Sequence, residues 1–249
     1  MIALFDSGSM RLHFGLWDGE RLLRIDHLPY PPGPASLEVV IDILVNDCDL
    51  TGAAACSVSN TWREALFRSV DGTVPGKLRV ARTAADVGVT VPYRAPETYG
   101  VDRALAVYAA YRRFGSSCVV ADAGTALTVD AVASNGSVAG GFIVPGFHLQ
   151  AGALDASTDL PTVVPGGDET ELGTNTTDSI RLGVGYGLKA AAKDLIMRAA
   201  DAVEAEDRII LTGGDADELV SLFPGQIAVF PGLVLEGLGL VMDNLPRFT

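Results

Sequence analysis

Residues 2–30, IALFDSGSMRLHFGLWDGERLLRIDHLPY, and residues 118–144, CVVADAGTALTVDAVASNGSVAGGFIV, share one pattern, and this pattern decides the fold. Each stretch begins with an apolar strand that ends in Asp-x-Gly, at Asp6-Ser7-Gly8 and at Asp122-Ala123-Gly124. Each then runs through a second strand, a tight-turn dipeptide and a third strand. The turn dipeptides are Asp18-Gly19 and Asn135-Gly136. Because the Asp-x-Gly turns lie 116 residues apart at matching places, we expect an internal duplication.

The segments between and after these stretches alternate between helical and strand patterns. We expect helices over residues 34–48, from about 62, 100–114, 176–205 and 233–245, and strands over 53–58, 78–81 and 208–212. This predicts an α/β protein of two related lobes, residues 1–114 and 115–249, each a mixed β-sheet with flanking helices. We expect a ligand cleft between the lobes, because no flexible linker separates them.

The composition indicates in which cellular environment we expect the chain. Its 249 residues are 48% hydrophobic, enough for a substantial core. No apolar run approaches the roughly 20 residues that a membrane span needs, and the start MIALFDSG lacks a basic leader. We therefore expect a cytoplasmic protein without membrane contact. The cysteines Cys48, Cys56 and Cys118 are expected to be reduced, and the scattered histidines do not indicate a zinc site.

The net charge of −13 argues against nucleic acid as a partner, because phosphate backbones are bound by Lys and Arg. A nucleotide remains compatible with this charge if backbone N–H groups and a divalent metal meet its phosphates. The chain has only three lysines and no G-x-x-x-x-G-K-[ST] run, which excludes a Walker-type phosphate loop.

The two Asp-x-Gly turns are the first candidate ligand sites. Glycine lets backbone N–H groups approach an anion closely, while the Asp carboxylate can hold a cation. Thr125, beside the second turn, can donate to a phosphate oxygen. The alternative is that Asp-x-Gly is simply a common turn.

Two further motifs suggest binding. Gly213-Gly214 follows an apolar strand and would let a flat ring such as adenine lie against the backbone, although a Gly-Gly pair is most often a turn device. Gly100-Val101-Asp102-Arg103 opens a helix. Asp102 there is either a first-turn residue favoured by the helix dipole or a general base for a hydroxyl, with Arg103 binding an anionic group.

Together these motifs resemble the type III pantothenate kinases along nearly the whole chain. The family's Asp-x-Gly-Thr-Ala-x-Thr run is similar to Asp122–Thr128, and its Gly-x-Asp-Arg motif, preceded by Tyr and Pro-Glu, is similar to Tyr93, Pro96-Glu97 and Gly100–Arg103. Its Gly-Gly and Pro-Gly pairs resemble Gly140-Gly141 and Pro145-Gly146, and its Gly-x-Asn-Thr resembles Gly173–Thr176.

The resemblance implies an actin-like ATPase fold and ATP-dependent phosphorylation of pantothenate, the first step of coenzyme A synthesis. Asp102 would be the general base, and Gly100, Val101, Arg103, Tyr93 and Thr176 would bind pantothenate. ATP would be bound by Asp6, which holds the Mg²⁺-nucleotide, by Ser7, Gly8, Ser9, Met10 and Arg11 of the first loop, and by Thr125, Gly213 and Gly214. Asp122 would hold a monovalent cation, K⁺ or NH₄⁺. The family also implies a homodimer.

The first loop departs from the family. Where the family has Asp-x-Gly-Asn-Thr, this chain has Ser9-Met10, which loses the amide and the second hydroxyl. A lost hydrogen bond to a charged phosphate costs about 1.5–3 kcal/mol. Thr174, where many members have Lys, is a second departure. A non-catalytic relative that binds pantothenate, nucleotide or a partner protein is therefore an alternative, and a kinase for another small hydroxylated acid is a third hypothesis.

Overall fold

The computed structural model describes residues 1–46, 48–164, 172–225 and 227–248. The chain forms two compact units. The first contains Met1–Ser116, Asn135–Val138 and Gly232–Thr249, and the second contains Ser117–Ser134 and Ala139–Pro231.

The first unit is built on a five-stranded sheet with the order β3-β2-β1-β4-β5. Its strands are β1 (Ile2–Ser7), β2 (Arg11–Trp17), β3 (Leu22–Pro29), β4 (Gly52–Ser57) and β5 (Leu78–Ala81). The strands β1, β2 and β3 form an antiparallel meander, whereas β4 runs parallel to β1 and β5 parallel to β4. The helices are α1 (Leu37–Val45), α2 (Arg63–Thr73), α3 (Ala84–Val87), α4 (Val101–Phe114) and α8 (Leu233–Val241), with 3₁₀ turns at Pro34–Ser36, Pro96–Thr98 and Met242–Asn244.

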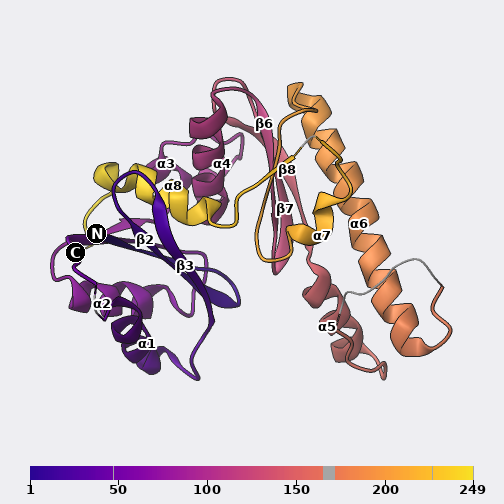
Figure 1. Ribbon diagram of the computed structural model, residues 1–249, viewed down its shortest axis with the longest axis horizontal. Coiled ribbons are helices and arrows are strands. Elements are labelled where there is room, and N and C mark those ends of the chain that lie inside the picture. The colour runs from indigo at the N-terminus through magenta and orange to yellow at the C-terminus, as the bar shows by residue number, and fades with distance from the viewer. Residues whose placement is uncertain (47, 165–171, 226, 249) are drawn as a thin grey trace. The chain divides into compact units, whose positions relative to one another are not determined.

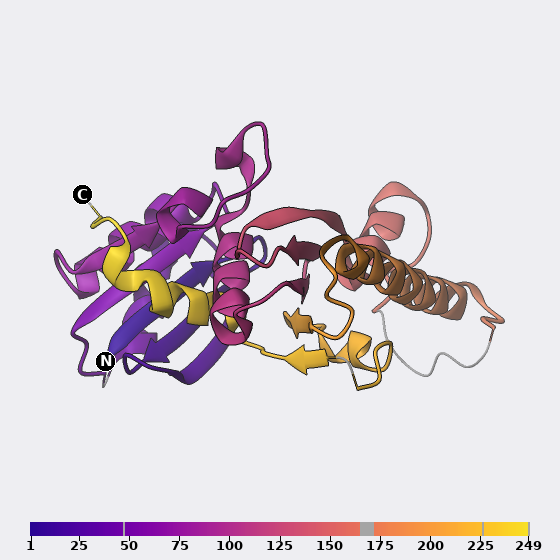
Figure 2. The same cartoon turned by 90° about the horizontal axis from the view of Figure 1, so that it is seen from above.

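The alternation of side chains in β1 separates the two faces of this sheet. Ala3 and Phe5 belong to a core that also contains the buried residues of α1 and α2. Asp6 therefore points to the opposite face, which α4 and α8 cover. Figure 2 shows α8 lying across the strands of this sheet.

The second unit repeats the strand order around β6 (Cys118–Ala123). Its sheet has the order β10-β9-β6-β7-β8, with β7 (Ala126–Val132), β8 (Val138–Pro145), β9 (Ile209–Thr212) and β10 (Ile227–Val229). The strand β7 is antiparallel to β6, β9 is parallel to β6, and β10 is parallel to β9. The helices are α5 (Phe147–Ser157), α6 (Thr176–Val203) and α7 (Asp217–Val220).

The long helix α6 runs along β6 and β7 (Figure 1). Asn175 caps it, because its side-chain oxygen accepts the backbone N–H of Asp178. Buried residues at four-residue spacing, Val184, Leu188, Ala192 and Ile196, form its apolar stripe and belong to the core of this unit.

The sequence-based prediction of fold class and of the duplicated three-strand pattern is confirmed. The predicted strands and the helices at 34–48, 62, 100–114, 176–205 and 233–245 are present, with ends shifted by a few residues. The helix α5, the short helix α3 and the strand β10 were not predicted.

The placement of α8 differs from the expected one, because this helix packs in the first unit and not with residues 115–231. The reason is a close contact with α4: a Cβ at Gly237 would lie 2.2 Å from the carbonyl oxygen of Leu105, so only glycine fits there.

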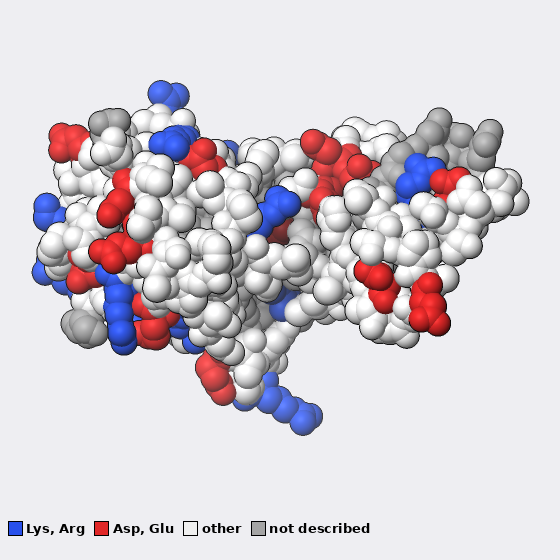
Figure 3. Space-filling view, turned by 90° about the horizontal axis from the view of Figure 1, so that it is seen from below, with Lys and Arg blue, Asp and Glu red and all other residues white. Residues whose placement is uncertain are grey.

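Two surface properties bear on possible partners. Among the described residues, none of the helices is long and apolar enough to cross a membrane. On the face drawn in Figure 3, the described acidic and basic side chains are interspersed and form no continuous basic surface.

Candidate active site

The first Asp-x-Gly loop is the tight turn that joins β1 to β2. The backbone N–H of Gly8 donates to the carbonyl of Arg11 at 3.1 Å. From the face that packs on α1 and α2, the Tyr30 hydroxyl donates to the Gly8 carbonyl at 2.8 Å and lies 2.6 Å from the Ser7 hydroxyl. Tyr30 stacks on Trp62 with ring centroids 4.3 Å apart. The hydroxyl of Ser7 is therefore engaged inside the protein, and Tyr30 is a support of this loop that the sequence did not reveal.

The remaining side chains of this loop lie at the surface. Ser9 and Arg11 are exposed, and Met10 is 59% exposed. A bound nucleotide could therefore meet these three side chains, and Met10 is not needed for the core.

Asp6 is a buried carboxylate with a weak donor beside it. Its side chain is 6% exposed, and Cys56 Sγ donates to Asp6 Oδ1 at 3.3 Å. Burial raises the pKa of Asp6 to about 6 against the lowering effect of that hydrogen bond. A carboxylate so poorly satisfied by the protein is suited to a cation.

Asp6 belongs to a row of polar side chains that crosses four strands. Cross-strand partners point to the same face, and the partners here are His27 with His13, His13 with Asp6, and Asp6 with Cys56. Burial and then the charge of Arg11 lower the pKa of His13. Burial, followed by the charges of His13 and Arg11, lowers the pKa of His27, while Asp26 raises it. Both imidazoles are thus held towards the neutral form.

Asp102 lies in the first turn of α4, where its carboxylate folds back over the helix start. Its Oδ1 accepts the backbone N–H of Arg103 at 2.8 Å. A Cβ at Gly100 would lie 2.4 Å from that oxygen, so glycine at the N-cap makes room for the carboxylate. Asp102 is also near Cys56, whose pKa is raised first by burial, then by the charge and hydrogen bond of Asp6, and then by the charge of Asp102. The first unit therefore brings Asp6 and Asp102 to the surroundings of one thiol.

Arg103 is fixed by two tyrosines at the same helix start. It is 7% exposed, its guanidinium lies 4.4 Å from the centroid of the Tyr99 ring, and its Nη1 donates to the Tyr93 hydroxyl at 3.3 Å. The two tyrosine rings meet edge to face, 5.2 Å apart. Val101 is buried beside them. Tyr99 was not among the predicted site residues, although it immediately precedes the Gly-x-Asp-Arg motif.

The second Asp-x-Gly loop, in the other unit, is enclosed by two glycines. A Cβ at Gly213 would lie 2.3 Å from the Ala123 carbonyl and 2.4 Å from Asp122 Oδ1, and Gly213 has φ +90°. A Cβ at Gly146 would lie 2.1 Å from the Gly124 carbonyl. The need for glycine at position 213 is thus explained by its packing against this loop.

Gly214 and Thr125 remain accessible beside the same loop. A Cβ at Gly214 would meet nothing within 4 Å, so the open surface at this junction lies at Gly214 and not at Gly213. Thr125 is half-buried, and its carbonyl accepts the backbone N–H of Gly146 at 2.9 Å.

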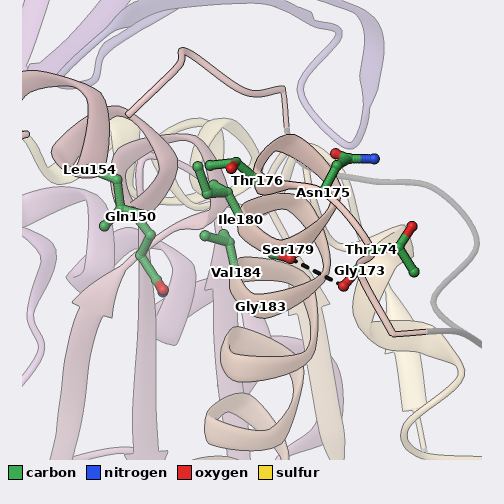
Figure 4. Close-up of a pocket in the computed structure, with 10 residues that line it drawn as sticks. All are labelled: Gln150, Leu154, Gly173, Thr174, Asn175, Thr176, Ser179, Ile180, Gly183 and Val184. Carbon is green, nitrogen blue, oxygen red and sulfur yellow. Dashed lines mark hydrogen bonds between the residues drawn. The ribbon is translucent and has the colours of Figure 1, made fainter. Parts of the chain in front are cut away.

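A pocket of about 640 Å³ lies between α5 and the start of α6 (Figure 4). Ile180 and Val184 of α6 face Gln150 and Leu154 of α5. Ser179 Oγ donates to the Gly173 carbonyl at 3.3 Å, which holds the Gly-x-Asn-Thr segment against the helix. Thr176, predicted to bind substrate, is exposed and lines this pocket.

The predicted residues therefore form groups within each unit. The first unit contains Asp6, the first loop, Tyr93 and Gly100–Arg103. The second unit contains Asp122, Thr125, Thr176, Gly213 and Gly214. Within the second unit, Asp122 lies against Gly213, while Thr176 lines the pocket between α5 and α6. The predicted cleft between the lobes stays a prediction.

The two sheets with an Asp-x-Gly loop at corresponding places define the fold class of the actin-like ATPases and sugar kinases. Solved structures share this fold. A Baf family transcriptional activator from Campylobacter jejuni has a TM-score of 0.62 at 20% identity, covering 97% of both chains. MreB5 of Spiroplasma citri bound to ADP has a TM-score of 0.53 at 9% identity, covering 97% of this chain and 96% of its own.

Within that class the chain belongs to the type III pantothenate kinase family. The family model matches residues 2–198. A type III pantothenate kinase from Alkalilimnicola ehrlichii is 36% identical over 240 residues, which cover 94% of this chain and 95% of the relative. The Thermobifida fusca enzyme of the same name is 30% identical, covering 88% and 90%.

Proposed function

We propose that this protein transfers the γ-phosphoryl group of ATP to the terminal primary hydroxyl of pantothenate, giving 4'-phosphopantothenate, the first step of coenzyme A synthesis, in the cytoplasm. The observation that carries the proposal is the start of α4, where a carboxylate and a fixed guanidinium stand side by side in the unit that also holds Asp6. Membership of the family supports the same reaction.

Asp102 is the general base of this proposal. Its Oδ1 accepts the backbone N–H of Arg103, which orients the carboxylate. A carboxylate oriented in this way accepts the proton of the attacking hydroxyl as the oxygen–phosphorus bond forms. Gly100, which has no side chain, leaves room for the carboxylate in this position.

Arg103 is the partner of the pantothenate carboxylate. Stacking on Tyr99 and the hydrogen bond to Tyr93 fix its guanidinium before substrate arrives, which reduces the entropy lost on binding. Gly100, Val101 and Tyr93 complete this part of the substrate site. In the second unit, Thr176 lines the pocket between α5 and α6 and is a further candidate for binding substrate.

Each Asp-x-Gly loop is, in its own unit, a candidate for binding the nucleotide. Mg²⁺ is usually bound by one or two carboxylates together with substrate phosphates, and it neutralises the charge that develops on the transferred group. Asp6 fits that role because it is a buried carboxylate whose side-chain donor, the Cys56 thiol, is a weak one. The exposed side chains of Ser9 and Arg11 in the first loop and Thr125 in the second would contact phosphates. Gly214 leaves room for the adenine, while Gly213 keeps the second loop in place.

Asp122 holds a monovalent cation, K⁺ or NH₄⁺, in this proposal. Its carboxylate lies against Gly213 at the second loop, in a chain of net charge −13. A cation there would offset the repulsion between this carboxylate and the polyphosphate.

We also propose a homodimer. Large apolar side chains are exposed in the second unit, among them Ile143, Leu149, Leu172 and Tyr186. Such side chains favour burial against a second copy. Sedimentation of the purified protein at micromolar concentration measures this directly.

The decisive experiment is a coupled ADP-release assay with pantothenate, Mg²⁺ and K⁺, on the wild-type chain and on Asp102→Asn. Asparagine is nearly isosteric but does not accept the hydroxyl proton, so we expect turnover to fall by about 10²-fold or more with the fold intact. A variant that keeps more than about half of wild-type turnover would leave Asp102 as a helix-start residue only. Binding of pantothenate without turnover in either protein would favour the non-catalytic alternative suggested by Met10.

A further inference from the structure

Two of the three histidines, His13 and His27, form a pair on the strands next to the first loop. Their Nδ1 atoms are 2.6 Å apart, and their rings meet edge to face with centroids 4.8 Å apart. In a neutral pair, this contact needs one ring to donate Nδ1–H and the other to accept with a bare Nδ1. The accepting ring then carries its proton on Nε2.

The second nitrogen of His13 borders the first loop. A Cβ at Gly8 would lie 3.6 Å from His13 Nε2. The same Cβ would lie 3.4 Å from the Arg11 carbonyl oxygen. Because glycine leaves this place open, a phosphate oxygen that passes beside the Gly8 Cα would come within hydrogen-bonding reach of Nε2. His13 also points to the same face as Asp6, its partner across the strands.

Two side chains of the loop supply no donor at this place, although Ser9 and Arg11 are exposed and can donate elsewhere in the loop. Met10 has no hydrogen-bond donor in its side chain, and the hydroxyl of Ser7 is engaged with Tyr30 on the opposite face. A polyphosphate that approaches Asp6 therefore meets the imidazole of His13 where a hydroxyl side chain of the loop is missing.

We propose that His13, oriented by His27, donates its Nε2–H to a phosphate oxygen of ATP and supplies a hydrogen bond that Met10 cannot make. In this arrangement His27 Nδ1–H donates to His13 Nδ1, which fixes the tautomer of His13. His13 contacts the nucleotide, and His27 is a positioning residue. The inference rests on the proposed function, because it concerns the nucleotide site of the same reaction.

Equilibrium binding of a non-hydrolysable ATP analogue with Mg²⁺, measured by calorimetry, tests the contact without requiring catalysis. We expect His13→Ala to weaken binding about ten-fold and to raise the KM for ATP in parallel, with the KM for pantothenate unchanged. His13→Gln keeps an N–H donor of similar reach and should stay within about three-fold of wild type. His148→Ala, which removes the third histidine from an exposed position on α5, is the matched control and should bind normally.

His27→Ala tests the positioning role. It should weaken analogue binding less than His13→Ala, and it should add nothing when His13 is already alanine, because its effect passes through His13. Equal losses that simply add in the double variant would overturn the role of His27.

Nitrogen-15 spectra of the labelled wild-type protein report the tautomer directly, even if an alanine variant fails to fold. In the analogue complex we expect His13 to be protonated at Nε2 and bare at Nδ1. The opposite tautomer, or analogue affinity within two-fold of wild type for His13→Ala, would refute the inference. A protein that binds the analogue through His13 but does not phosphorylate pantothenate would uphold this inference and overturn the proposed function.

Discussion

Replacing Asp6 by asparagine should stabilise the protein at neutral pH while removing its nucleotide site. Burial raises the pKa of Asp6 from 3.8 to about 6. A pKa difference of one corresponds to about 1.4 kcal/mol, so keeping this carboxylate ionised inside the folded protein at pH 8 costs about 3 kcal/mol. Because the pKa is higher in the folded state, this state binds more protons than the unfolded state between pH 3.8 and 6. The free energy of unfolding therefore falls as the pH rises through this window, and asparagine removes that loss.

The assay is urea or thermal unfolding of wild type and Asp6→Asn at pH 5 and pH 8, without metal or nucleotide. We expect the variant to be more stable by about 2–3 kcal/mol at pH 8, with a smaller advantage at pH 5. Asp42→Asn replaces an exposed carboxylate on α1 and is the control. It should change the free energy of unfolding little at either pH. Saturating Mg²⁺ and ATP should reverse the order, because only the wild type gains the stabilisation of bound nucleotide. An advantage of Asp6→Asn that is equal at both pH values would refute the reasoning.

Two further predictions concern cations and the altered loop. Turnover should require K⁺ or NH₄⁺ in addition to Mg²⁺, because Asp122 faces the polyphosphate in the proposed site; equal rates in sodium-only and potassium buffers of matched ionic strength would contradict this. Ser9→Asn combined with Met10→Thr should raise kcat/KM for ATP by about ten-fold in the His13→Ala background. The same change should give a smaller gain when His13 is present, because two donors to one phosphate are not additive. Equal gains in both backgrounds would show that the loop and His13 act independently.

Local sequence signals were sufficient for most of the fold. Apolar strand runs, the turn dipeptides Asp18-Gly19 and Asn135-Gly136, and the helical pattern of residues 176–205 are properties of neighbouring residues. Each predicted element of this kind is present. The helix α5 was missed because it begins directly after Pro145-Gly146, which indicates a turn. The short strand β10 is too brief to show a period of its own.

The candidate site also has a part that the sequence predicted and a part that it did not. The residue types and spacing of Asp6, Gly100–Arg103 and Asp122 could be recognised in the sequence, because motif chemistry lies in consecutive residues. The groups that surround these residues could not be recognised in the sequence, because those contacts join residues far apart in the chain. Tyr30 below the Gly8 carbonyl, Cys56 beside Asp6, and Gly213 against Asp122 all depend on strand register.

The sequence alone therefore determined the class of fold, the family and the residues that could do chemistry. The tertiary structure decided which of those side chains are engaged and which are available. Ser7 is committed to Tyr30, Gly213 is required by packing, and His13 is turned towards Gly8. The physical reason is that hydrogen bonds and close contacts between strands depend on register and on which face a side chain takes, and a shift of one residue would exchange both.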